Sequence, residues 1–322
     1  MRFWKAGSSA FVVAAVSLLA AACTPALGAS DAPEKPNIVV TDFPTVDAAG
    51  LYIAQMDGLF RQQGLNVTIR PAAASQLAAS SVVNGTSDIA VADYVTYINT
   101  EINQGARLRI IDEASALQPD DLALLASPRS GIGTLSQLQG RTVGVVAEDD
   151  ISTLLVDAVL TENGVNPQAV NLEPGFPLQN VAGQVNSGLA EAAPIPEPFA
   201  SESEQTYGLR EVADIDQGVT KNFPLDGYAV TEAWARKHPN TLAAFSRALQ
   251  QGQQIADTDR SQVEAAVEKY LVISPWTASM VALPDYPLSV NPGQLQRVVD
   301  AMVQFSLLPP ENRNFKITSM TG

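Results

Sequence analysis

Carboxylates gather in one loop near the middle of the chain, Glu148-Asp149-Asp150. The loop follows the apolar run 142–146 and comes just before a helical pattern that begins at Ser152. Carboxylate oxygens accept hydrogen bonds, so these residues could hold a cation or a group that carries amino hydrogens. Acidic residues before a helix also cap its N-terminus and favour its dipole, and for Asp149 and Asp150 this structural role is an equally open alternative.

Residues for nucleophilic or metal chemistry are sparse. The chain has one His, His238, beside Pro239 at a predicted helix end, where it is expected to be solvated or to act as a C-terminal cap. Its one Cys is Cys23, so neither a Cys/His metal set nor a Cys-His or Ser-His-Asp constellation can be argued. No phosphate-binding G-x-x-x-x-G-K-[ST] loop occurs. We therefore expect no enzymatic activity, no cofactor and no metal.

The N-terminus has the pattern of an export signal. Arg2 and Lys5 precede an apolar run, 11–22, that is too short to span a bilayer. Small residues before Cys23 resemble the bacterial lipobox, in which the Cys thiol receives diacylglycerol, although Ala20 stands where Leu is usual. We expect a signal peptide over 1–22, a Pro-rich tether over 23–35 and an extracytoplasmic protein held to the cell membrane by lipidated Cys23. An ordinary secretory signal with an incidental Cys is the alternative.

Charge and length narrow the class of protein. The formal charge of −15 would become −17 once Arg2 and Lys5 are cleaved off. Nucleic acids and anionic lipid surfaces are held by Lys and Arg, so neither is an expected partner. About 300 remaining residues are enough for two lobes, each with its own core.

Short strand patterns alternate with helical patterns in the first two thirds of the chain, which predicts an α/β fold with parallel strands. Strands are expected at 37–41, 67–70, 89–91 and 142–146, with helices at 48–60, 76–83 and 152–162. Two stretches recur about a hundred residues apart: Gln63-Gly64-Leu65-Asn66 with Asn163-Gly164-Val165-Asn166, and 85–90 with 188–193. Two similar lobes in tandem would explain the echo, and chance likeness between βαβ units is the alternative. From Glu232 onward only helices are expected.

Five motifs in order give the chain a family resemblance. They are Gly50–Ala54 with Asp57–Phe60 and Gly64–Val67, Asn84–Ala90, Leu135–Gly144, Pro196–Phe199 and Asp300–Leu308. Together they resemble the extracellular solute-binding proteins of the nitrate/sulfonate/taurine and thiamine-pyrimidine importer superfamily. The resemblance implies a type II periplasmic-binding-protein fold, α/β, with two lobes and a ligand cleft between them. Lobe one would take 36–122 and 229–322, lobe two would take 127–224, and the crossings would fall near 123–126 and 227–230.

Ligands of open α/β sheets sit beyond the carboxyl ends of the strands, which points to the loops at 42–47, 72–76, 92–94 and 147–152. Acidic side chains there oppose a free anion, and aromatic side chains beside them could stack on a flat ring. The expected ligand-binding residues are Asp42, Phe43, Asp47, Tyr52, Ser75, Gln76, Asp93, Tyr94, Glu148, Asp149, Ser152, Glu197, Phe199 and Tyr228.

The resemblance and these residues together predict a monomeric, lipid-anchored binding component of an ABC importer. Its partners would be a small-molecule ligand and the importer's permease and ATPase subunits. The expected ligand is a small neutral or cationic ring, of the pyrimidine or vitamin-precursor type. An oxyanion such as an alkanesulfonate, taurine or nitrate is the alternative, and a thiamine-pyrimidine synthase-like enzyme is the alternative of another class.

Overall fold

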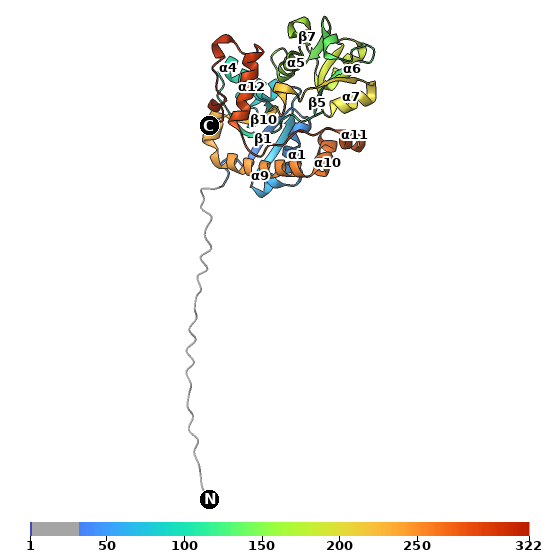
Figure 1. The fold of residues 1–322 in the computed structure, drawn as a ribbon. Coiled ribbons are helices and arrows are strands. Elements are labelled where there is room, and N and C mark those ends of the chain that lie inside the picture. Colours follow the sequence, from blue (N-terminus) through green and yellow to red (C-terminus); the bar gives the residue numbers. More distant parts are fainter. Residues whose placement is uncertain (2–31, 322) are drawn as a thin grey trace. The chain divides into compact units, whose positions relative to one another are not determined.

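A computed structural model of the chain describes Met1 and residues 32–321 (Figure 1). The expected signal peptide, most of the tether and Cys23 lie outside the described residues. Residues 32–321 form two five-stranded sheets. The first sheet contains β1 (Asn37–Asp42), β2 (Asn66–Pro71), β3 (Ile89–Asp93), β4 (Leu108–Glu113) and β10 (Asp226–Thr231). The second contains β5 (Leu122–Ala126), β6 (Thr142–Val145), β7 (Asn171–Pro174), β8 (Ala192–Pro196) and β9 (Arg210–Asp214).

Helices pack on both sheets, and we call each sheet with its helices a lobe. Lobe one carries α1 (Ala49–Met56), α2 (Leu59–Gln62), α3 (Ser75–Val83), α4 (Tyr94–Gln104), α8 (Glu232–Lys237), α9 (Pro239–Thr258), α10 (Arg260–Tyr270), α11 (Pro275–Met280) and α12 (Pro292–Gln304). Lobe two carries α5 (Ile151–Glu162), α6 (Leu178–Ser187) and α7 (Phe199–Tyr207). The helix expected over 48–60 is divided into α1 and α2, because Gly58 adopts a left-handed φ of 70°. The helices expected from Glu232 onward are present as α8 to α12.

The two sheets have the same topology. Their strand orders are β2-β1-β3-β10-β4 and β7-β6-β8-β5-β9. The first three strands of each order are parallel. The fourth strand is antiparallel to both of its neighbours. Gly64 and Gly164 occupy matching left-handed positions after a helix, with φ of 77° and 70°. The repeated segments in the sequence therefore reflect two lobes that share one topology.

An acidic residue supports β1 of lobe one and β6 of lobe two in the same way. The Val39 N–H donates to the Asp88 carboxylate at 2.9 Å, and the Thr142 N–H donates to the Glu191 carboxylate at 2.9 Å. The backbone N–H of each acidic residue returns a bond to the carbonyl of the same partner, also at 2.9 Å. The parallel between 85–90 and 188–193 thus has a structural cause, because these carboxylates fix where β3 and β8 begin.

Two segments connect the lobes, at 114–121 and 215–225. The crossings were expected at 123–126 and 227–230, but these ranges are parts of the strands β5 and β10. Their apolar residues are buried within a sheet, which explains why they are not linkers. Two hydrogen bonds join the crossing segments. The Leu117 N–H donates to the Phe223 carbonyl at 2.8 Å, and the Leu225 N–H donates to the Ser115 carbonyl at 3.1 Å.

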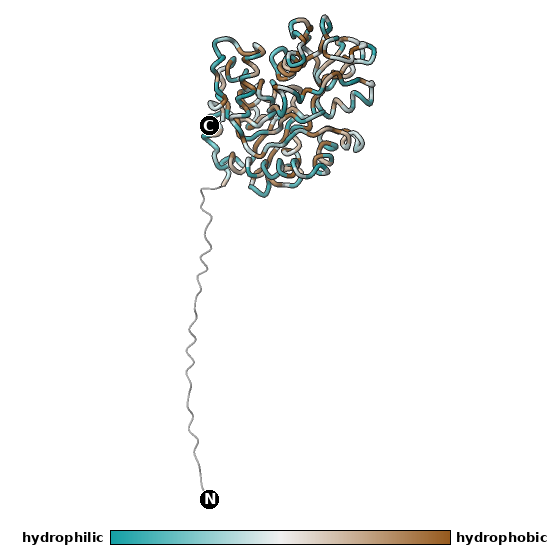
Figure 2. Tube along the Cα trace, in the orientation of Figure 1, coloured by the Kyte–Doolittle hydropathy of each residue, from teal (hydrophilic) through white to brown (hydrophobic). Residues whose placement is uncertain are grey.

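The cores lie between each sheet and its helices. Hydrophobic residues follow the inner strands and one face of the helices, and hydrophilic residues follow the outer loops (Figure 2). In the described part of the chain, no helix combines the length and apolar character needed to cross a bilayer.

Candidate functional site

A cavity of about 70 Å³ lies between the two lobes. Its walls come from the carboxyl ends of the parallel strands β1, β3, β6 and β8 and from the starts of the antiparallel strands β5 and β10. This is the place where open α/β sheets bind ligands. The lining residues are Phe43, Thr45, Asp47, Ser75, Gln76, Asp93, Leu122, Val146, Asp150, Ile151, Ser152, Leu178, Pro194, Pro196, Leu225 and Asp226.

Four carboxylates face this cavity, three from lobe one and one from lobe two. Asp47, Asp93 and Asp226 come from lobe one, and Asp150 comes from lobe two. Asp47, Asp93 and Asp150 are each less than 5% exposed. Among the described residues that line the cavity, none is Lys, Arg or His. The cavity therefore concentrates negative charge from both lobes without a protein cation to balance it.

Local sequence explains how two of these carboxylates are held. Asp93 is the N-cap of α4, and its oxygens accept from the Thr96 N–H and the Thr96 hydroxyl, both at 2.7 Å. Asp150 is the N-cap of α5, and its Oδ1 accepts from the N–H groups of Ser152 and Thr153 and from the Ser152 hydroxyl. The Asp150 Oδ2 makes no such capping bond. Capping and facing the cavity are therefore compatible at both positions.

Burial and mutual repulsion favour the neutral form of these groups. Burial, and then the charge of Asp93, raises the pKa of Asp150 to about 7. Burial also raises the pKa of Asp93 against the opposing hydrogen bonds from Thr96. The pKa of Asp226 is raised well above its usual range, first by burial and then by the charges of Asp47 and Asp93. A cation in the cavity would reverse this trend, because an opposite charge favours the ionised carboxylate.

One oxygen of the Asp47 carboxylate can still accept a hydrogen bond. One of its oxygens accepts from the Thr45 hydroxyl, while its Oδ1 is buried without a hydrogen bond to the described protein atoms. A buried carboxylate oxygen without a donor is costly, and a ligand N–H would satisfy it.

The opposite wall of the cavity is apolar, and two prolines shape it. Pro194 and Pro196 lie in β8 and have no N–H to donate to a neighbouring strand. β6 and β8 accordingly pair at a single position, Val143 with Ala192, whereas β1 and β3 pair at three. The prolines thus give this side of the cavity an apolar wall where β8 makes few hydrogen bonds to β6.

The structure places the residues expected from sequence in three settings. Six of them line the cavity: Phe43, Asp47, Ser75, Gln76, Asp93 and Ser152. Asp42, Tyr52, Tyr94 and Tyr228 lie outside the lining. Asp42, Tyr94 and Tyr228 are fully buried, and the Tyr52 ring stacks on Tyr270 at 3.7 Å. Glu148 and Asp149 are exposed outside the cavity, Glu197 is buried at the end of β8, and Phe199 begins α7.

Asp42 forms a second acidic layer behind the cavity lining. Burial raises its pKa to about 7, the Tyr52 hydroxyl favours its ionised form, and the charge of Asp47 raises the pKa further. Asp42 also adds to the charge that raises the pKa of Asp226. It acts on the site through these neighbours.

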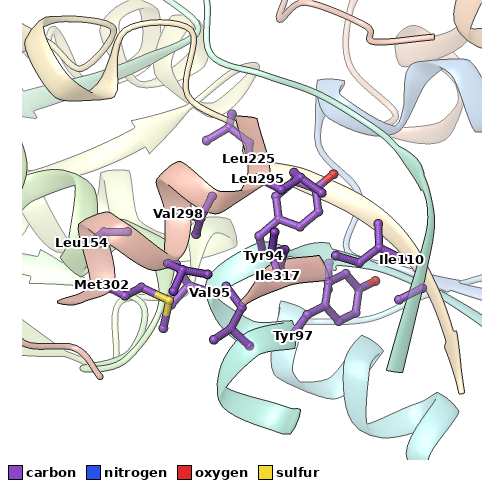
Figure 3. Packing of buried hydrophobic residues seen from close by; sticks show 14 of the residues in the cluster. Tyr94, Val95, Tyr97, Ile110, Leu154, Leu225, Leu295, Val298, Met302 and Ile317 are labelled. Carbon is purple, nitrogen blue, oxygen red and sulfur yellow. The ribbon is translucent and has the colours of Figure 1, made fainter. Parts of the chain in front are cut away.

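The lobes touch around the cavity. The Asn99 side chain of α4 donates to the Asp149 carbonyl at 2.8 Å, and the Ala282 N–H lies 3.4 Å from a carboxylate oxygen of Glu197. Leu154 of α5 belongs to the same buried cluster as Val298 and Met302 of α12 (Figure 3). The arrangement is therefore a nearly closed one.

Sequence reasoning did not select several lining residues. Asp150 was recognised only as a member of the acidic run, and Asp226 was missed because it begins a strand that leaves a crossing segment. The N-cap pattern, Asp before Ser152-Thr153, was the available signal for Asp150. Leu178, Pro194 and Pro196 carry no chemical signal of their own. Among residues 32–321, no group of three or more His, Cys, Asp or Glu side chains is arranged to hold a metal ion.

Comparison with solved structures identifies the fold. The alkanesulfonate-binding protein SsuA from Xanthomonas axonopodis pv. citri, bound to MOPS, has a TM-score of 0.73 at 16% identity, covering 88% of this chain and 97% of its own. The nitrate-binding protein NrtA from Synechocystis PCC 6803 has a TM-score of 0.72 at 14% identity, covering 87% and 84%. The expected periplasmic-binding-protein fold, with two α/β lobes, is therefore confirmed.

Sequence comparison gives the family. YtlA of Bacillus subtilis (strain 168), whose name gives it provisionally as a binding protein, is 24% identical over 240 residues, which are 69% of this chain and 71% of YtlA. Residues 45–260, more than half of the chain, match the family described as NMT1/THI5 like. This match agrees with the resemblance seen in the five sequence motifs. The chain belongs to the NMT1/THI5-like family.

Proposed function

We propose that this protein is the solute-binding component of an ABC importer. Its family, its fold and a cavity between two lobes joined by two connecting segments support this role. Among the structures that share the fold is the ligand-binding component of an ABC-type import system from Staphylococcus aureus, with a TM-score of 0.75 at 11% identity. The proposal includes a monomer outside the cytoplasm, tethered through lipidated Cys23, that delivers its ligand to permease and ATPase subunits. It also includes the absence of catalysis.

The ligand we propose is a small neutral or cationic ring, of the pyrimidine or vitamin-precursor type. The four carboxylates around the cavity carry this proposal, because they accept hydrogen bonds from ring amino groups or balance a positive charge. Phe43 and the two prolines supply apolar contact for the ring. A ring needs more room than 70 Å³, so the lobes would stand further apart around it than they do here.

An oxyanion is the second candidate, since SsuA is named as alkanesulfonate-binding and NrtA as nitrate-binding. Those proteins share the fold at 14–16% identity, a level that carries no information on the ligand. A like charge a few ångströms away costs on the order of 1–4 kcal/mol at the dielectric of a protein surface or of water. The described lining residues include no Lys, Arg or His, so an anion would have to rely on uncharged donors such as the Ser75 and Ser152 hydroxyls.

A thermal-shift panel followed by calorimetry tests the proposal. The panel contains pyrimidines, amines, flavins, alkanesulfonates, taurine and nitrate, because any ligand that binds the native state raises its stability by mass action. We expect a shift with an aminopyrimidine or another cationic ring and none with the anions. Tight binding of taurine, an alkanesulfonate or nitrate would overturn the ligand proposal. Recovering the bound ligand chemically altered, by mass spectrometry, would overturn the claim that the protein is not an enzyme.

A further inference from the structure

A second, larger hollow lies on lobe two. It is a groove of about 550 Å³ between α6 and α7. Leu178 and Phe199, the first residues of the two helices, line one end of it, and Ser187 and Tyr207, the last residues, line the other. The groove therefore runs along both helices, starting at the edge of lobe two that faces the interlobe cavity.

Leu178 lines both the groove and the interlobe cavity. It follows Pro177, the N-cap of α6, and is 7% exposed. It packs in a buried cluster with Phe176 and Ile195, against which Phe199 of lobe two and Phe43 of lobe one also pack. One apolar side chain thus forms part of the wall between a cavity of about 70 Å³ and a groove nearly eight times larger.

The chemistry of the two compartments differs. The cavity holds four carboxylates, whereas Glu202 is the one charged residue that lines the described groove. Most of the other lining side chains of the groove carry amides or hydroxyls: Gln179, Asn180, Gln184, Ser187, Ser203, Thr206 and Tyr207. Gln184 has a buried side-chain oxygen without a hydrogen bond within the described protein. Uncharged groups that donate and accept hydrogen bonds fit such a lining.

We propose that Leu178 sets the maximum size of the solute, by separating the acidic cavity from a groove lined mostly by uncharged polar residues that could otherwise hold an extension of the ligand. This inference rests on the proposed function, because it takes the interlobe cavity as the binding site. Leu178, α6 and α7 all belong to lobe two. The wall therefore moves with lobe two and remains in place whether the lobes are close together or apart.

The test uses two probes that share one head. The compact probe is 4-amino-5-hydroxymethyl-2-methylpyrimidine, and the extended probe is its ether with a hydroxyethyl tail. Calorimetry compares the wild-type chain with Leu178→Ala and with Leu178→Val, a smaller truncation in case the first variant unfolds. Leu189→Ala is the matched control, because Leu189 follows the far end of α6, is 65% exposed and lines neither compartment.

We expect the Kd of the compact probe to stay within about threefold in Leu189→Ala. The Kd of the extended probe, divided by that of the compact probe in the same variant, should fall at least tenfold in Leu178→Ala, by less in Leu178→Val and not in Leu189→Ala. Adding Thr206→Val, in the groove, to Leu178→Ala should remove part of that gain while leaving the compact probe unaffected.

Two results would overturn the inference while leaving the proposed function in place. One is a wild-type chain that binds the extended probe as tightly as the compact one, and the other is a Leu178→Ala variant that changes the binding of both probes equally. If the compact probe fails to bind the wild-type chain and Leu189→Ala at millimolar concentration, the proposed ligand class fails, and the size limit at Leu178 fails with it.

Discussion

Asp93 and Asp150 cap helices in different lobes and face the same cavity, and the charge of Asp93 contributes to the raised pKa of Asp150. As the lobes close, two like charges approach each other, which opposes closure when both are ionised. Under the proposed function, a cation or an amino-bearing ring between them would convert this repulsion into two favourable contacts. The pair would thereby link ligand charge to closure of the lobes.

Asp150→Asn should weaken binding of a cationic ring ligand by about ten- to a hundredfold. Loss of a charge-assisted hydrogen bond costs roughly 1.5–3 kcal/mol, and 1.4 kcal/mol is a factor of ten. Asn is as good an N-cap as Asp, so the start of α5 should survive the change. Calorimetry gives the affinity, and a thermal melt gives the stability. The same ten- to hundredfold loss should be found with Asp93→Asn.

Asp149→Asn is the matched control for this pair of variants. It removes one negative charge from the neighbouring residue, which is exposed and does not line the cavity. We expect less than a threefold change in affinity. Equal losses in Asp149→Asn and Asp150→Asn would mean that only the overall charge of the loop matters.

Periodicity and turn residues were sufficient to predict most of the fold. The strand expected at 37–41 is β1, and the helix expected at 152–162 is α5. The repeated segments, 63–66 with 163–166 and 85–90 with 188–193, occupy equivalent places in the two lobes. These features are local, because helix ends and strand starts depend on nearby residues. The positions of the crossings were not predictable in the same way. Both expected crossings, 123–126 and 227–230, consist mainly of apolar residues. Such residues can form a strand, but it is their pairing with distant segments that places them inside a sheet.

The candidate site was predictable where a residue ends a strand, as at Asp93, or lies in the loop that follows one, as at Asp47. It was not predictable where burial depends on tertiary packing. Tyr94 and Tyr228 follow or lie within cleft strands, yet their side chains point into the core and are fully buried. The side of a strand or helix that faces the ligand is fixed by packing, which alternation alone does not reveal for strands buried on both faces.

Asn99→Ala should weaken ligand binding by about two- to tenfold. The Asn99 amide donates to the Asp149 carbonyl across the lobes, and a neutral hydrogen bond contributes roughly 0.5–1.5 kcal/mol. That bond exists only when the lobes are close, so the loss should be in the rate of ligand release, measured by stopped-flow fluorescence. Asn103→Ala, one turn further along α4 and exposed, is the control and should release ligand at the wild-type rate. A release rate unchanged in Asn99→Ala would contradict the closed arrangement as the ligand-holding state.

The proposed lipid anchor predicts a simple fractionation result. The wild-type chain, expressed in a bacterial host, should sediment with membranes, and mass spectrometry of the mature protein should show diacylglycerol on Cys23. Cys23→Ser should appear in the soluble extracytoplasmic fraction with its ligand affinity unchanged, because Cys23 is remote in sequence from every lining residue. An unmodified Cys23 on the mature wild-type chain would refute the lipid anchor and leave an ordinary secretory signal.

Burial is the main cause that raises the pKa of Asp42 and the pKa of Asp150 to about 7 each. These raised pKa values predict opposite pH trends for the stability of the empty protein and for its affinity for a cation. An unfolded Asp ionises near pH 3.9, so the native state holds protons that the unfolded state has released between about pH 4 and pH 7. The stability of the empty protein should therefore fall as pH rises through this window and level off above it.

Binding of a cation needs the ionised carboxylates, so its affinity should rise over the same window. We expect the Tm of the empty protein to be lower at pH 8 than at pH 5, by about 2–4 °C for each kcal/mol of lost stability. The shift in Tm given by a saturating cationic ligand should be larger at pH 8.

Asp150→Asn should reduce both trends, while Asp149→Asn should reproduce the wild-type curves. The exposed Glu34 has a pKa lowered to about 2 despite its slight burial, because the Asn240 and Thr241 N–H groups bond to it, so its effect is confined to more acidic pH. A Tm of the empty protein that rises from pH 5 to pH 8, or a ligand shift that is the same at both, would show that these carboxylates are ionised without a ligand.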